Sequence, residues 1–182
     1  MPGSLHLGHA ESHPGPNREV VSTSNAPKAI GPYSQGIKAG DFLFTAGEAG
    51  VDPATGRLVE GGIAAQTRKA LENVQAILEA AGTSLQRVVK CGVFLADLAD
   101  FQAMNAVYAG FFPADQGPPA RTTVQAAKLP MGALVEIDAI ALLGWDSRRR
   151  PVPEDFAVEN GSALPTIVVG SPDGQRVCSA LE

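Results

Sequence analysis

A single amphipathic helix constrains this fold more than any other feature of the sequence. Apolar residues recur at helical spacing between residues 63 and 81, and the charged residues of that segment fall outside the stripe. Gly82 follows at the position where glycine commonly ends a helix. A helix with one apolar face has to cover another layer, so this segment predicts a helix packed on a β-sheet.

Short β-prone runs on both sides of that helix predict the sheet. Residues 40–41 are a turn that joins two of these runs into a hairpin. Asp97 or Asp100 can cap a second helix over residues 101–112, whose inner face carries Phe101 and Tyr108. The predicted strands cover residues 20–23, 33–39, 42–47, 88–95, part of 118–130, and 134–143.

This order of elements predicts an α+β fold with two helices on one face of a largely antiparallel or mixed sheet. The strands are apolar on both sides in places, as at residues 42–44 and 93–95. Two helices can cover only one face of the sheet. We therefore expect a second copy of the chain to cover the other face.

Composition sets further bounds on the chain. Its 182 residues suit one domain with a proper core, and a net charge of -5 argues against a broad surface for nucleic acid or anionic membranes. Cys91 and Cys178 are too few and too far apart for a disulfide framework or a zinc site, which indicates a reducing, cytoplasmic setting. No apolar run approaches the roughly 20 residues of a membrane span. Phosphate-loop, HExxH, CxxC and GxSxG motifs are absent from the sequence.

The two ends of the chain differ in composition from the middle. Residues 1–18 hold all three histidines among Gly, Pro and Ser, which predicts a disordered leader rather than a signal or transit peptide. Residues 19–144 form the predicted domain. Residues 145–182 predict a linker-like extension with one strand-like run at 166–169.

Arg121 is the first charged residue of the proline-bounded stretch 118–130, and no acid lies close to it in sequence. A guanidinium at the start of a strand offers a planar fork of donors that suits a carboxylate or a phosphate. The turn to the strand of Glu136 is short, so we expect the two strands to be hairpin partners. The alternative interpretation is a surface arginine that forms an ordinary salt bridge.

Several short motifs lie between residues 20 and 144. They are AIGPYSQ at 29–35, TAG at 45–47, VVK at 88–90, LADLADF at 95–101, Asn105, PAR at 119–121, AKLP at 127–130 and VEI at 135–137. Together these motifs resemble the RidA (YjgF) family of reactive-intermediate imine deaminases. The resemblance covers residues 20–144 and leaves the two ends of the chain outside.

The resemblance implies a chorismate-mutase-like protomer, a homotrimer with a central barrel, and sites in clefts between subunits. It implies hydrolysis of 2-imino or enamine acids, such as 2-iminobutanoate and 2-iminopropanoate, to 2-oxo acids and ammonia, with no cofactor and no metal. Arg121 would bind the substrate carboxylate and Glu136 would hold the attacking water.

The resemblance also implies four substrate-binding positions. Tyr33 would line the cleft, Asn105 would lie near it, and Gly47 would belong to a loop whose backbone faces the ligand. Thr123 stands where cysteine is common in the family, and Ala46 stands where many members have serine. The role of Thr123 therefore stays open.

Two other functions remain as alternatives. A ligand-sensing or RNA-directed interaction protein would use the arginine run at 148–150, although such a run is more often a solvated linker. A chorismate mutase is conceivable from the fold alone, but fold does not determine function.

Overall fold

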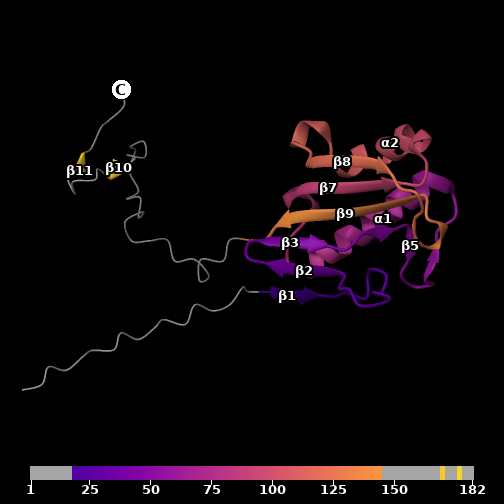
Figure 1. The fold of residues 1–182 in the computed structure, drawn as a ribbon, viewed down its shortest axis with the longest axis horizontal. Coiled ribbons are helices and arrows are strands. Elements are labelled where there is room, and N and C mark those ends of the chain that lie inside the picture. The colour runs from indigo at the N-terminus through magenta and orange to yellow at the C-terminus, as the bar shows by residue number, and fades with distance from the viewer. Residues whose placement is uncertain (1–17, 145–168, 171–175, 178–182) are drawn as a thin grey trace, which may run out of the picture. The chain divides into compact units, whose positions relative to one another are not determined.

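The computed structural model describes residues 18–144, 169–170 and 176–177. The larger part is a seven-stranded mixed sheet with the strand order β1-β2-β3-β9-β7-β8, in which β4 also pairs with β9 (Figure 1). The strands are β1 (Arg18–Val21), β2 (Gly36–Ala39), β3 (Phe42–Thr45), β4 (Glu48–Ala49), β7 (Val88–Leu95), β8 (Ala120–Gln125) and β9 (Val135–Leu142). A separate ribbon pairs β5 (Val51–Asp52) with β6 (Arg57–Leu58).

Two α-helices, α1 (Gly62–Ala80) and α2 (Phe101–Phe111), lie on one face of this sheet (Figure 1). Helix α1 ends as predicted, because Gly82 takes a φ of 80° and donates its N–H to the Glu79 carbonyl. Asp97 caps the 3-10 turn before α2 by accepting from the Ala99 N–H. The α+β architecture with a mixed sheet and two helices is confirmed.

The pairing of β8 differs from the prediction. Strand β8 pairs in parallel with β7, and β9 pairs with β3 and β7 instead of β8. The expected hairpin between the strands of Arg121 and Glu136 is therefore wrong. Helix α2 connects β7 to β8, as a parallel pair requires, and β8 forms an edge of the sheet.

The sheet has a core face and an open face. On the core face, Val135, Ile137, Ala139 and Ala141 alternate along β9 and are almost completely buried. The open face carries the alternate residues, and several large apolar side chains on it are exposed in the single chain. They are Val20, Phe42, Phe44, Val124 and Leu142.

The remaining predictions concern the ends of the chain. Val169–Gly170 (β10) pairs antiparallel with Arg176–Val177 (β11) in a second compact unit, and the rest of the predicted run at 166–169 lies outside the described residues. Residues 1–17 of the predicted leader and the arginine run at 148–150 also lie outside them. The leader boundary at residue 18 is wrong, because Arg18 pairs with Ala39 as the first residue of β1. Within the described part of the chain, no helix is long and apolar enough to cross a membrane.

Candidate active site

Arg121 lies on the core side of the edge strand β8, beneath α2. Its register partner on β7 is the buried Cys91, which places its side chain on the same face as the helices. The guanidinium carbon lies 4.5 Å from the ring centroid of Tyr108 and 5.6 Å from that of Phe101. Among the described residues, the two ion pairs are Lys38–Glu19 and Lys69–Glu72, so the Arg121 cation has no acidic partner there.

Two further predicted residues share this location. Thr123 follows Arg121 by two positions in β8, so its side chain points to the same face, and its buried Oγ1 has no hydrogen-bond partner. Asn105 lies between Phe101 and Tyr108 on one stripe of α2. The Tyr108 hydroxyl is also buried, where it interacts with the Cys91 thiol. Buried polar groups therefore gather between α2 and the sheet edge, and the Thr123 Oγ1 has no partner among the described residues, as expected for a site that binds a polar ligand.

Glu136 lies on the open face of the sheet, near its centre. A Cβ at Gly47 would overlap the Glu136 Oε1, so the glycine makes the space that this carboxylate occupies. Burial, together with the nearby Asp138 carboxylate, raises the pKa of Glu136 above its ordinary value. A carboxylate with a raised pKa is better matched to proton transfer near neutral pH.

Glu48 is an acid that is not among the predicted site residues. It pairs with Ile137 in register, which turns its side chain toward the core, and the residue is 5% exposed. Burial raises its pKa to about 8, with a smaller contribution from the Glu136 carboxylate. Glu48 is therefore protonated at neutral pH, and Glu136 has an uncharged neighbour there.

Tyr33 lies in the loop before β2, near the other edge of the sheet. Its hydroxyl accepts a hydrogen bond of 3.2 Å from the Ile30 N–H, and the residue is 53% exposed. Gln35 anchors this loop, because its side chain accepts from the Thr23 N–H and donates to the Pro27 carbonyl. The loop thus presents an exposed phenol at a defined position.

One protomer brings the six predicted residues into three separate places. Arg121, Asn105 and Thr123 lie at the β8 edge, and Gly47 and Glu136 lie on the open face. Strand β7 stands between β8 and β9 in the strand order, and Arg121 and Glu136 point to opposite faces of the sheet. Tyr33 belongs to neither group. A single chain therefore does not assemble these residues into one pocket.

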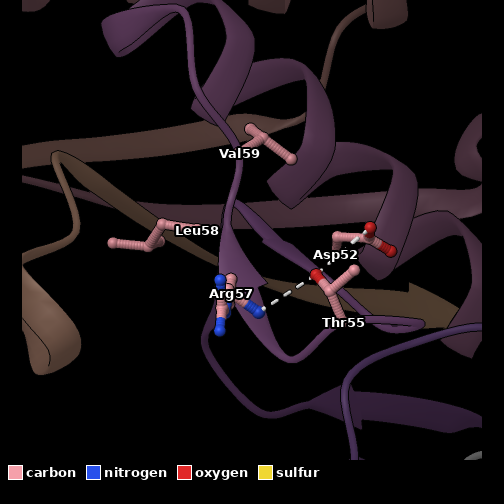
Figure 2. A pocket seen from close by; sticks show the side chains of 5 residues that line it. All are labelled: Asp52, Thr55, Arg57, Leu58 and Val59. Carbon is pink, nitrogen blue, oxygen red and sulfur yellow. Dashed lines mark hydrogen bonds between the residues drawn. The ribbon is translucent and has the colours of Figure 1, made fainter.

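A surface hollow of about 450 Å³ lies elsewhere, at the turn between β5 and β6 (Figure 2). Asp52 accepts hydrogen bonds from the Ala54 N–H and from the Thr55 hydroxyl, at 2.9 and 3.3 Å, and these bonds shape the turn itself. None of the predicted site residues lines this hollow. The residues that the structure describes contain no group of His, Cys, Asp and Glu that could hold a metal ion.

The sequence prediction missed the aromatic residues around Arg121. Phe101 and Tyr108 were assigned to the inner face of a helix, and both do pack inward. Their spacing gives the helical face but not the strand against which that face packs. The signal for Glu48 was weak: an acid within a segment of small residues that would otherwise be buried.

The described residues thus form an α+β protomer with Arg121, which has no acidic partner among them, at a sheet edge and Glu136 on the open face. The family model described as Endoribonuclease L-PSP matches residues 23–143. The chain belongs to this family, also known as RidA, YjgF or RutC.

Individual relatives agree with this assignment. A RutC family protein of Pyrococcus horikoshii is 56% identical over 68% of this chain and 97% of its own length. The 2-iminobutanoate/2-iminopropanoate deaminase of Bos taurus is 46% identical over 70% of this chain and 91% of its own. The chloroplastic Reactive Intermediate Deaminase A of Arabidopsis thaliana is 48% identical over 69% of this chain and 66% of its own.

Solved structures show the same fold. The crystal structure of E. coli TdcF with bound serine has a TM-score of 0.66 and 43% identity, and the match covers 69% of this chain and 99% of TdcF. The structure of the E. coli YjgF gene product has a TM-score of 0.64 and 44% identity, covering 68% of this chain and 98% of that chain.

Proposed function

We propose that this protein hydrolyses reactive 2-imino and enamine acids, such as 2-iminobutanoate and 2-iminopropanoate, to 2-oxo acids and ammonia in the cytoplasm. The observation that carries this proposal is the Arg121 guanidinium, held at the sheet edge without an acidic partner among the described residues. A relative at 46% identity is named a 2-iminobutanoate/2-iminopropanoate deaminase, and one at 48% identity is named a Reactive Intermediate Deaminase A, which supports the substrate class.

The residues suit a reaction that needs no cofactor. An iminium carbon is already electrophilic, so the enzyme mainly has to orient the substrate and place a water molecule. Arg121 binds the substrate carboxylate through two parallel N–H···O bonds. Glu136 takes a proton from the water as its oxygen bonds to C2. It then returns that proton to the nitrogen as the C–N bond breaks and ammonia leaves. The C2 hydroxyl releases its remaining proton to solvent as its C–O bond becomes the carbonyl of the 2-oxo acid.

The proposed site requires two protomers. Arg121 and Glu136 point to opposite faces of one sheet, so a complete pocket needs the Glu136 side of a neighbouring copy. The apolar open face, with Phe42 and Phe44 about 40% exposed, provides a surface for that neighbour. We infer a homotrimer with three sites between subunits and with the open faces turned to its centre.

Mixing two inactive variants tests this arrangement. Arg121→Ala and Glu136→Gln protomers are unfolded, mixed in equal amounts and refolded together. If each site takes its arginine and its glutamate from different protomers, about one site in four receives both intact residues by random assembly. The mixture then regains about a quarter of the wild-type activity. A mixture that stays inactive would show that both residues act from one protomer.

The activity itself is tested by coupling the protein to a threonine dehydratase and following imine decay and 2-oxo acid release. Arg121→Ala should lower kcat/KM by at least tenfold, because a charged hydrogen-bonded contact is worth roughly 1.5–3 kcal/mol. Arg57→Ala, at an exposed position on β6, is the matched control. If Arg121→Ala removes the imine as fast as wild type, the carboxylate-binding role is wrong.

An RNA-directed role is the second candidate, because the matched family model is described as an endoribonuclease. The net charge of -5 opposes it. Replacing Arg148, Arg149 and Arg150 together with alanine separates the two functions. An RNA role should suffer from this change, whereas deaminase activity should persist.

A further inference from the structure

The Arg121 guanidinium lies against two aromatic rings of α2. Its central carbon is 4.5 Å from the centroid of Tyr108 and 5.6 Å from that of Phe101, within the range of cation–π contacts. These rings belong to helix α2, which lies in the crossover between β7 and β8, the strand that carries the arginine. The contact therefore joins β8 to α2 through the proposed substrate-binding side chain.

We propose that Tyr108, assisted by Phe101, is a positioning residue that holds the Arg121 guanidinium in the orientation needed to bind a substrate carboxylate. The inference rests on the proposed function, since it assigns a role in the same site. A ring that covers the flat face of a guanidinium leaves the N–H groups at its edge free. Those N–H groups are the ones that bind a planar carboxylate in a bidentate manner.

Tyr108 is itself held firmly, as a positioning residue has to be. It is 5% exposed, and its ring lies 4.7 Å, centroid to centroid, from the ring of Phe112. Burial raises the pKa of the Tyr108 phenol above its usual range, so the ring next to the cation stays neutral. The arginine, in contrast, has a long side chain that would sample many rotamers without such a contact.

The ring, and not the hydroxyl, carries this role. The buried Tyr108 hydroxyl interacts with the Cys91 thiol, and no hydrogen bond joins it to Arg121 in the described part of the chain, so it does not orient the guanidinium through a hydrogen bond. This distinction gives the proposal a matched pair of variants. Tyr108→Phe keeps the ring and removes the hydroxyl, whereas Tyr108→Leu removes the ring and keeps an apolar side chain.

The test measures KM and kcat with 2-iminobutanoate, and the binding of 2-oxobutanoate by calorimetry. Loss of the ring should raise KM and the 2-oxobutanoate Kd together by about 3- to 30-fold, the range that cation–π contacts imply, with kcat within about twofold of wild type. Tyr108→Phe should match wild type in both measurements. Phe101→Leu, at a less buried position, should shift them in the same direction by a smaller factor, and it tests the proposal if Tyr108→Leu does not fold.

Phe112→Leu is the control for general packing, because Phe112 stacks on Tyr108 and makes no cation–π contact with Arg121. The proposal is overturned if this control shifts KM and Kd as much as Tyr108→Leu does, or if Tyr108→Phe loses as much affinity as Tyr108→Leu. Unchanged KM and Kd in folded Tyr108→Leu or Phe101→Leu also overturn it. If the wild type binds 2-oxobutanoate but does not hydrolyse the imine, the proposed function fails, and the binding series still decides the role of Tyr108.

Discussion

Replacing Glu48 with glutamine should stabilise this protein, and the gain should grow as the pH rises. Glu48 is 5% exposed, and neither ion pair of the described residues includes it. Burial, and secondarily the Glu136 carboxylate, raises the pKa of Glu48 from 4.5 to about 8. Glutamine has nearly the same shape and never ionises, so the substitution removes this titration without leaving a cavity.

The sign and the size of this change in stability follow from proton linkage. The folded chain keeps the Glu48 proton up to about pH 8, whereas an unfolded chain releases it near pH 4.5, so wild-type stability falls as the pH rises between these values. Between pH 4.5 and pH 7 the free energy of unfolding of the wild type falls by about 1.36 kcal/mol per pH unit. Over these roughly 2.5 pH units the wild type therefore loses about 3 kcal/mol of stability. For a domain of this size, that difference corresponds to a rise in Tm of about 6–12 °C in the variant.

The measurement is denaturant unfolding of wild type and Glu48→Gln at pH 5 and pH 8, at equal protomer concentration. The stability difference should be below about 1 kcal/mol at pH 5 and several kcal/mol at pH 8. Glu72→Gln, in a partly exposed pair with Lys69 on α1, is the control and should change stability by less than about 1 kcal/mol at both pH values. Equal differences between Glu48→Gln and wild type at the two pH values would refute the assignment of Glu48 as a buried neutral acid.

Three further predictions concern the open face of the sheet. Gly47→Ala should lower kcat at least tenfold, because the new Cβ would displace the Glu136 carboxylate. Gly110→Ala, in the last turn of α2 where a Cβ would meet no atom within 4 Å, should leave kcat unchanged; steady-state kinetics with circular dichroism as a folding control decides this. Glu136→Gln should lower kcat by about 10²- to 10⁴-fold with little change in KM. Because the pKa of Glu136 is raised, the wild-type rate should fall with decreasing pH at a midpoint above 4.5. A pH–rate profile whose midpoint is that of an ordinary glutamate would contradict this. Phe44→Glu, opposite Ile140 on the open face, should dissociate the oligomer, and light scattering that finds the same mass for variant and wild type would show that this face is not the interface.

The local elements could be predicted because each has its own signal in the sequence. Helix α1 follows from its apolar period and from Gly82, and its observed bounds differ from the predicted ones by one residue at each end. Strand β7 matches its prediction, and β9 follows from strict alternation. The short strand β4 and the β5–β6 ribbon were missed, because runs of two residues carry no period.

Strand pairing could not be predicted in the same way. Alternation along β9 states which residues share a face, but it is equally compatible with β8 or with β3 and β7 as partners. The segment between β8 and β9 is also longer than a tight hairpin loop, and it contains a 3-10 turn in which Met131 takes a φ of 58°. A loop of that kind can carry the chain past β7 to the centre of the sheet, which is where β9 lies.

The error in pairing matters more for the site than for the fold. With β8 and β9 as neighbours, Arg121 and Glu136 could have formed a cross-strand pair that neutralised both charges. In the observed sheet, β7 separates them and the two side chains point to opposite faces, so each keeps its charge available. The arginine rests on aromatic rings instead of a carboxylate, and the glutamate lies in the space above Gly47. The same topology prevents a salt bridge between Arg121 and Glu136 within one chain, so the proposed site, which uses both side chains, has to take them from two protomers.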